Sequence, residues 1–223
     1  GITREQQDRV AALSHQRAEA AIADGTFAAE IVPVEVKTRK GTVTVDTDEG
    51  VRAGTTEDSL AALRPAFATD GTITAASASQ ISDGAAAVVL TTRKYAADNG
   101  LTVLAAVGAA GETAGPDTLL HSQPAQAVTA ALTKAGWEAA DLDFLEINEA
   151  FAAVVVQSLK DLDYPLEQTN IHGGGISLGH PIGASGARLV VAAAYELDRR
   201  GSGRAAVSLC GGGGQGDALL LWR

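Results

Sequence analysis

The chain has no methionine and only one cysteine, and aromatic residues make up 4% of its 223 positions. The single cysteine, Cys210, excludes an intrachain disulfide, which suits a reducing compartment. Long apolar runs are also missing, because the apolar stretches, such as residues 85–90 and 151–156, fall far short of the roughly 20 residues that span a bilayer. The amino end is charged and rich in glutamine, unlike a signal sequence. We therefore expect no membrane segment and a cytoplasmic location.

The missing methionine also bears on how the chain arises. A direct translation product begins with methionine, whereas this chain begins with Gly1 and contains none. We expect that a further segment precedes the chain, or preceded it before processing.

Basic residues are scarce, since 17 Lys and Arg against 27 Asp and Glu give a formal net charge of −10. No long basic run offsets this charge, and such a surface would repel a phosphate backbone, so we expect no general nucleic-acid binding. The hydrophobic content of 46% rests on alanine, valine and leucine, which suits close-packed helices and buried strands rather than disorder. The composition indicates a globular α/β protein.

The first part of the chain is irregular and rich in loops. Thr3 and Gln6 have the spacing of a capping box, which predicts a helix over residues 4–23 that ends at Asp24-Gly25. β-branched residues predict short strands, and Pro65 must end a short helix before it. The other elements expected up to residue 100 are strands at 31–36, 42–45 and 85–90 and helices at 57–63 and 92–99.

Strands and helices alternate from about residue 103 onward. The expected strands cover 103–107, 144–147, 170–172, 205–209 and 218–222, and the expected helices cover 123–135, 149–160 and 184–200. Helices of this length between strands require crossover connections. This pattern predicts the order β-α-β-α-β-α-β-β, a mostly parallel sheet covered on both faces, and an antiparallel pair at the end.

Three segments follow strands at the edge where α/β sheets usually bind ligands. They are 148–152 (NEAFA), 173–186 (GGGISLGHPIGASG) and 210–216 (CGGGGQG). The last contains G-x-G-x-x-G, but a dinucleotide-binding loop must open a helix, and only seven residues remain after it. We therefore reject a dinucleotide site there.

A serine hydrolase is a second alternative, because residues 175–179 match G-x-S-x-G and would make Ser177 the nucleophile. That fold needs a histidine on a separate later loop, and His180 is too close in sequence to come from one. A metal site has little support, because there is no cysteine pair and the histidines are scattered.

Cys210, His180 and Asn148 are the candidate reactive residues. A lone cysteine at a strand end is usually a small buried hydrophobe, but the four glycines after Cys210 leave backbone N–H groups open to a ligand. Such a thiol could exchange protons with a bound substrate. His180 lies in a turn before a helix, and Asn148 lies between a strand and a helix, where it can cap the helix and also serve a site.

Together these segments resemble the thiolase family, through NEAFA, then GHP within a glycine-rich loop, then C-x-G-G-G-x-G near the carboxyl end. The likeness extends to residues 51–67 (VRAGTTEDSLAALRPAF) and 71–90 (GTITAASASQISDGAAAVVL), and so covers essentially the whole chain. The sequence looks closest to the acetyl-CoA acetyltransferases within that family, and it corresponds to their C-terminal half.

The resemblance implies the thiolase fold. Residues 1–80 would belong to the loop domain that binds coenzyme A, and residues 81–102 would be the strand and helix that return to the N-terminal core domain. Residues 103–223 would form the C-terminal core domain, whose element order agrees with the alternation of strands and helices expected above.

The resemblance also implies a reaction, the reversible Claisen condensation of two acetyl-CoA to acetoacetyl-CoA and free coenzyme A. The nucleophilic cysteine would lie in an N-terminal fragment outside this chain. Cys210 matches the second cysteine, a general acid and base, and His180 matches the histidine that activates the nucleophile. Asn148 would position a water in the same oxyanion hole as His180, and the N–H of Gly212 would belong to a second hole.

For coenzyme A, the resemblance implies contacts from Arg52, Ser59, Leu63, Ala75 and Ser79. Arg52 would lie near the adenine and phosphate end, where a guanidinium is well suited, and Ser79 would contact the pantetheine. The thioesters are substrates, and we expect neither a bound cofactor nor a metal. The expected partners are the N-terminal fragment and further copies of the complete protein, as a dimer or tetramer.

Some positions depart from the family pattern. Ala76-Ser77 stands where the family often has Gly-Asn, and His172 stands where it often has Asn. These differences leave open a degradative 3-ketoacyl-CoA thiolase that acts on longer chains. A non-catalytic thiolase-like subunit is a further alternative, although it would have no need of Asn148, His180 and Cys210 together.

Overall fold

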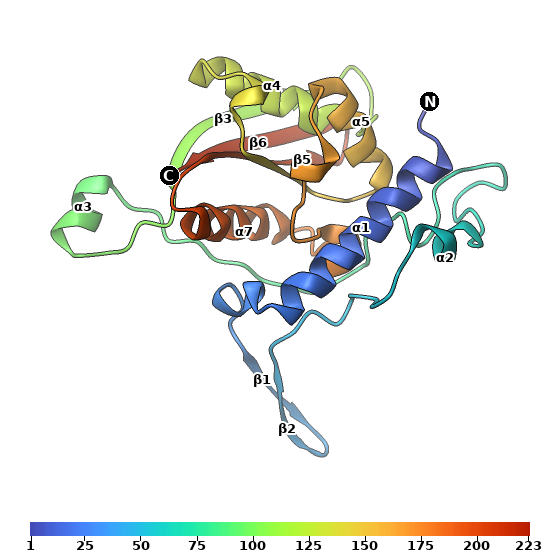
Figure 1. The fold of residues 1–223 in the computed structure, drawn as a ribbon, viewed down its shortest axis with the longest axis horizontal. Helices are drawn as coiled ribbons and strands as arrows, with labels where there is room; N and C mark the ends of the chain where they lie inside the picture. The colour runs from blue at the N-terminus through green and yellow to red at the C-terminus, as the bar shows by residue number, and fades with distance from the viewer.

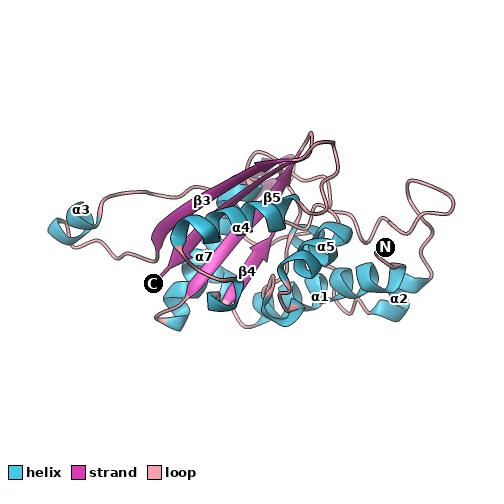
Figure 2. Ribbon diagram, turned by 90° about the horizontal axis from the view of Figure 1, so that it is seen from above, coloured by secondary structure: helices cyan, strands magenta, loops and turns pink.

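A mixed four-stranded sheet organises the second half of the chain in the computed structural model, which describes residues 1–223. Its strands are β3 (Ala106–Ala114), β4 (Phe144–Ile147), β5 (Arg204–Gly211) and β6 (Gln215–Trp222), in the order β3-β6-β5-β4. β4 and β5 pair in parallel, and β6 is antiparallel to both of its neighbours. Three strands therefore run one way and β6 runs against them (Figure 2). The antiparallel final pair is confirmed. The prediction of a mostly parallel sheet is wrong for the pairing of its strands, because β3 also pairs antiparallel with β6 and only β4 and β5 pair in parallel.

Helices cover both faces of this sheet, as the sequence predicts. α4 (Gln123–Ala135) and α5 (Ala152–Leu162) lie on one face, and α7 (Ser185–Arg200) lies on the other (Figure 1). Successive residues of a strand point to opposite faces. On β5, Ala206 and Cys210 accordingly join the cluster beneath α4 and α5, while Ala205 and Val207 join the cluster beneath α7.

The long helix α1 (Arg4–Ala23) matches its predicted bounds, and the predicted capping box is present, with the Thr3 hydroxyl accepting from the Gln6 N–H. Gly25 follows the helix in a left-handed conformation, as expected for a helix end. α1 packs against α5, α2 (Glu57–Ala61) and the short helix α6 (Gly175–Leu178). It therefore supports the segment that leads to His180.

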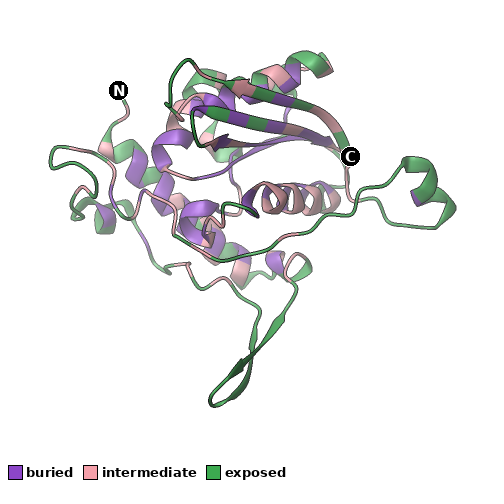
Figure 3. Cartoon of the chain, turned by 180° about the vertical axis from the view of Figure 1, so that it is seen from behind, coloured by how far each residue is buried: buried purple, intermediate pink, exposed green.

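The irregular parts of the chain project from this body. The hairpin of β1 (Val34–Thr38) and β2 (Gly41–Val45) is exposed along its whole length, and α3 (Arg93–Asp98) lies at the end of a long excursion (Figure 3). Three 3-10 turns complete the structure: η1 (Thr26–Ala29), η2 (Ala139–Asp141) and η3 (Leu166–Gln168). None of the helices combines the length and the apolar character that a membrane crossing requires.

Two predicted strands are wrong. Residues 85–90 form no strand, and Val89 and Leu90 are 93% and 72% exposed, because no other strand of this chain lies beside them. Residues 170–172 make only isolated bridges, since Asn170 adopts a positive φ of 49° that interrupts an extended strand. The strand predicted at 103–107 is shifted, and β3 runs from Ala106 to Ala114.

Candidate active site

The carboxyl ends of β4 and β5 bring Asn148 and Cys210 to the same edge of the sheet. The two strands are parallel, Ile147 pairs with Ser208, and the Asn148 N–H donates to the Ser208 carbonyl at 2.9 Å. Cys210 lies two residues farther along β5, and neighbouring strands are about 4.8 Å apart. Both side chains are buried.

His180 reaches this edge from the loop between α6 and α7. Its Nε2 lies 3.2 Å from Asn148 Nδ2, and its Nδ1 lies 2.6 Å from Ser185 Oγ. The Ser185 hydroxyl donates its one proton to the Pro181 carbonyl at 3.0 Å, so it can only accept from the imidazole. This assigns the ring proton to Nδ1 and leaves a lone pair on Nε2, which accepts from Asn148.

The protonation states of His180 and Cys210 follow from their burial. Burial lowers the pKa of the His180 imidazole, and the positive charge of Arg188 lowers it further, so the ring is neutral near pH 7. Burial raises the pKa of the Cys210 thiol by more than a backbone hydrogen bond lowers it. The site thus combines a neutral base with a protonated thiol.

The side-chain oxygen of Asn148 lacks a hydrogen-bond partner. This atom, Oδ1, is buried, and an unpaired buried carbonyl carries a desolvation cost. The oxygen faces the loop around Gly175, where an added Cβ would lie 3.2 Å from it. An ordered water is the natural partner for such an atom.

Glu149 fixes the loop that carries His180. Its buried carboxylate accepts from Ser14 Oγ at 2.6 Å, from Asn170 Nδ2 at 2.9 Å and from the Ile176 N–H at 3.1 Å. Gly174 must be glycine here, because a Cβ would meet the carboxylate carbon at 2.5 Å. Burial raises the pKa of Glu149, and its three hydrogen bonds act in the opposite direction. One side chain thus joins α1, the end of β4 and the start of α6.

Ser79, which was predicted to contact coenzyme A, lies between the NEAFA segment and the loop that carries His180. Its N–H donates to the Ala150 carbonyl at 3.0 Å, and Ala78 forms an antiparallel bridge with Phe151. On the other side, the His180 N–H donates to the Gln80 carbonyl at 3.3 Å. The NEAFA segment, Ser79 and the histidine loop are therefore in direct contact.

Arg52 lies on a loop that α1 holds in place. The Arg52 N–H donates to His15 Nδ1 at 3.1 Å, and the Gln16 side chain donates to the Thr55 carbonyl at 2.8 Å. The Arg52 side chain is exposed and forms no ion pair, so its guanidinium is free to meet a phosphate.

The other predicted coenzyme A residues lie farther along the same segment. Ser59 belongs to the capping box of α2, since its hydroxyl accepts from the Thr56 N–H at 3.1 Å and its N–H donates to the Thr56 hydroxyl at 3.2 Å. Leu63 is 41% exposed and Ala75 is also exposed, on the two sides of the bridge between Pro65 and Thr74. The structure shows no hydrogen bond between any of these three residues and Arg52 or Ser79.

The glycines after Cys210 form the turn from β5 to β6. Gly213 and Gly214 have φ angles of 87° and 81°, and a Cβ on Gly214 would meet the Asp117 carbonyl oxygen at 2.0 Å. Gly212 is exposed, and nothing lies within 4 Å of where its Cβ would be. A strand rather than a helix follows, so the rejection of a dinucleotide loop is confirmed.

The geometry also argues against a serine hydrolase. Ser177 is fully buried in α6, where its hydroxyl bonds with Ser14 and donates to the Gly174 carbonyl. No hydrogen bond joins Ser177 to His180, whose ring bonds to Asn148 and Ser185. Ser177 therefore has no histidine to activate it.

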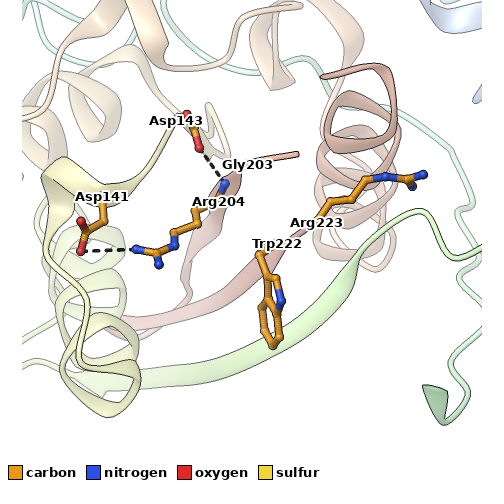
Figure 4. A pocket seen from close by; sticks show the side chains of 6 residues that line it. All are labelled: Asp141, Asp143, Gly203, Arg204, Trp222 and Arg223. Atoms are coloured by element: carbon orange, nitrogen blue, oxygen red, sulfur yellow. Dashed lines mark hydrogen bonds and ion pairs between the residues drawn. The ribbon is translucent and has the colours of Figure 1, made fainter. Parts of the chain in front are cut away.

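A shallow pocket of about 380 Å³ opens at the opposite end of the sheet (Figure 4). Arg204 at its edge lies six residues before Cys210 on β5, which corresponds to about 20 Å of strand. The Arg204 guanidinium lies 3.7 Å from Asp141 and stacks on Trp137, and Arg223 pairs with Asp198. Both arginines of the pocket are therefore paired with carboxylates, and Asp143 accepts from the Arg204 N–H.

Comparison with known proteins identifies the family. The model of the thiolase C-terminal domain matches residues 101–223, and that of the thiolase N-terminal domain matches residues 1–94.

The chain belongs to the thiolase family.

It is 57% identical over 223 residues to the "Probable acetyl-CoA acetyltransferase" of Mycolicibacterium smegmatis, and the match covers 100% of this chain and 58% of that relative. The crystal structure of the Bacillus anthracis acetyl-CoA acetyltransferase matches with a TM-score of 0.96 and 43% identity, and that of human mitochondrial 3-ketoacyl-CoA thiolase with 0.90 and 38%. Each of these two matches covers 99% of this chain and 56% of the solved chain.

These matches confirm the thiolase fold for this chain, which spans little more than half the length of the thiolases it matches. The division at residues 80 and 102 stays a prediction. Sequence reasoning missed two residues that hold the candidate site, Ser185 and Glu149. Ser185 could have been noticed in the GASG run before α7, and Glu149 lies inside NEAFA itself.

Proposed function

We propose that this chain supplies part of the active site of an acetyl-CoA acetyltransferase, which condenses two acetyl-CoA to acetoacetyl-CoA and coenzyme A. The observation that carries the proposal is the Asn148–His180–Ser185 arrangement, which places the proton of the neutral ring on Nδ1 and makes Nε2, held by Asn148 Nδ2 at 3.2 Å, the basic nitrogen. The names of the Mycolicibacterium relative and of the Bacillus structure support the choice of substrate. The nucleophilic cysteine belongs to an N-terminal fragment that binds this chain, and the complete protein forms a dimer or tetramer.

In the first half-reaction, His180 Nε2 takes the proton of the nucleophilic cysteine. The resulting thiolate attacks the carbonyl carbon of acetyl-CoA, so that a new C–S bond forms and the bond to coenzyme A breaks. Cys210 gives its proton to the departing coenzyme A thiolate. A thiol whose pKa is raised by burial suits this step because it is protonated at rest.

In the second half-reaction, the Cys210 thiolate left by that transfer removes a proton from the methyl group of a second acetyl-CoA. The carbanion attacks the acetyl carbonyl on the nucleophilic cysteine, so that a C–C bond forms and the C–S bond breaks. The released cysteine thiolate recovers its proton from the His180 imidazolium, and both residues return to their starting states.

Two groups of donors stabilise the oxyanions in this proposal. A water held by Asn148 and the Nε2–H of the His180 imidazolium, formed once His180 has taken the cysteine proton, make one hole, and the backbone N–H of Gly212 contributes to the other. Preorganised donors of this kind are a major source of rate enhancement. The empty hydrogen-bonding position of Asn148 Oδ1 supports the water.

Coenzyme A lies along the segments that carry Arg52 and Ser79, with Ser59, Leu63 and Ala75 beside it. The exposed, unpaired guanidinium of Arg52 supports its place at the phosphates. Coenzyme A thioesters are substrates, and the reaction as written needs no bound cofactor.

A degradative 3-ketoacyl-CoA thiolase for longer chains is the second candidate, favoured by the TM-score of 0.90 with the human mitochondrial enzyme. Thiolysis assays on the complete protein with acetoacetyl-CoA and with a longer 3-oxoacyl-CoA separate the two. We expect cleavage of the short substrate and little of the long one. Preference for the long substrate favours the second candidate, and no cleavage of either contradicts both.

A further inference from the structure

Gln80 joins the loop that leads to Arg52 and the loop that carries His180. Its side-chain Nε2 donates to the carbonyls of Gly50 and Ile176, both at 3.0 Å, and lies 3.4 Å from the Ser177 carbonyl. The backbone carbonyl of Gln80 accepts from the His180 N–H at 3.3 Å. One half-buried residue thus contacts both the loop that leads to Arg52 and the loop that carries His180.

The surroundings of Gln80 are shaped to receive its amide. A Cβ on Gly50 would lie 2.6 Å from Gln80 Nε2 and 2.6 Å from the Ser177 carbonyl oxygen, so only glycine leaves room there. The three carbonyls converge on one amide nitrogen, whose two protons they share. Next to them, Gly179 has a φ of 95°, and a Cβ would meet the Ser82 hydroxyl at 2.3 Å. The two loops are therefore packed tightly around the segment 80–82.

We propose that Gln80 is a positioning residue that locks the His180 loop to the coenzyme-A-binding segment, so that binding of coenzyme A sets the position of the imidazole. This inference rests on the proposed function. Coenzyme A held by Arg52 and Ser79 orders residues 50–52 and 79 directly. The Gln80 amide transmits that order to Ile176 and Ser177, three to four residues before His180.

The experiment uses the complete enzyme with Gln80→Met, which keeps the length of the side chain and removes both donors. Gln157→Met is the matched control, because Gln157 bonds only to Asp161 on the exposed face of α5. Hydrogen exchange of the peptide covering residues 174–182 is measured with and without coenzyme A, alongside kcat and KM for thiolysis of acetoacetyl-CoA.

In the unsubstituted enzyme and in Gln157→Met, we expect coenzyme A to slow exchange in this peptide. In Gln80→Met, exchange becomes about tenfold faster, coenzyme A no longer slows it, and kcat falls about tenfold while KM for coenzyme A changes less than threefold. In Gly50→Ala, the added methyl group displaces the Gln80 side-chain amide, and we expect the same changes in exchange and in kcat as in Gln80→Met. A purely structural role would lower the melting temperature but leave the response to coenzyme A intact.

The proposal is overturned if Gln80→Met matches Gln157→Met in kcat and in its exchange response to coenzyme A. That result leaves the proposed function standing, because the unsubstituted enzyme still turns over. If the unsubstituted enzyme shows no thiolysis, the proposed function fails, and the role of Gln80 fails with it.

Discussion

Replacement of Glu149 tests how the site is held together. Its carboxylate accepts from Ser14, Asn170 and the Ile176 N–H, all within the buried interior. Asn170 is fixed in orientation, because its Oδ1 accepts from the Ile147 N–H at 2.8 Å and its Nδ2 donates to the Ile147 carbonyl at 2.9 Å. The amide of Asn170 must therefore present a donor to whatever stands at position 149.

The expected cost differs between two substitutions. Glu149→Ala leaves the Ile176 N–H without a partner and weakens the bonding of Ser14 and Asn170, and each unsatisfied buried group costs about 1–3 kcal/mol. Relief of the buried charge offsets part of this loss, so we expect a net destabilisation of about 2–4 kcal/mol. Glu149→Gln keeps one acceptor but opposes its own amide to that of Asn170, which costs about 1–2 kcal/mol.

Urea unfolding at pH 7 measures these differences. Gln157→Ala, which removes only a bond to Asp161 at the surface of α5, is the control and should stay within about 0.5 kcal/mol of the unsubstituted protein. The unsubstituted protein should be the most stable, Glu149→Gln should be intermediate, and Glu149→Ala should be the least stable. If Glu149→Gln proved as stable as the unsubstituted protein, or less stable than Glu149→Ala, the hydrogen-bond assignment would be refuted.

Three further predictions address the histidine, a buried carboxylate and coenzyme A. Ser185→Ala removes the acceptor that holds the His180 ring, so kcat should fall roughly 10–100-fold with little change in KM, and unchanged kinetics would contradict the tautomer argument. Burial raises the pKa of Glu146 from 4.5 to about 8, so the folded state holds that proton more tightly than the unfolded state. Its contribution to stability is complete below pH 4.5 and is lost as the pH rises through about 8, and Glu146→Gln should flatten this part of a plot of melting temperature against pH. Arg52→Ala should raise KM for coenzyme A about tenfold at low salt and less at high salt, and a salt-independent KM would argue against a phosphate contact.

Local signals were sufficient for elements whose ends are fixed by capping or by periodicity. The capping box of Thr3 and Gln6 and the Asp24-Gly25 stop predicted both ends of α1, and the strand predicted at 144–147 matches β4. β3 was misplaced because glycine and alanine determine its packing. A Cβ on Gly111 would lie 2.0 Å from the Ala127 carbonyl oxygen, so small residues allow α4 to approach, and they carry no strand propensity.

The strand predicted at 85–90 failed for a different reason. A continuous apolar run predicts a buried strand, but burial depends on a partner that local sequence does not name. In the structure, Val89 and Leu90 have no such partner and are exposed.

In the candidate site, too, local sequence predicted some features and not others. The positions of Asn148, His180 and Cys210 could be inferred from motifs, because each lies at the end of a strand or before a helix at the same edge. The supporting contacts could not be inferred, since Ser14 and Gln80 lie far in sequence from Glu149 and Ile176, which they contact. Only the fold brings them together.

The most direct test of the proposed chemistry is Cys210→Ala in the complete enzyme. Mass spectrometry after incubation with acetyl-CoA should still detect an acetyl group on the nucleophilic cysteine, because His180 remains to activate it. Condensation to acetoacetyl-CoA should fall on the order of 10²–10⁴-fold, the range of a lost general acid and base. Full condensation activity in this variant would contradict the role assigned to Cys210.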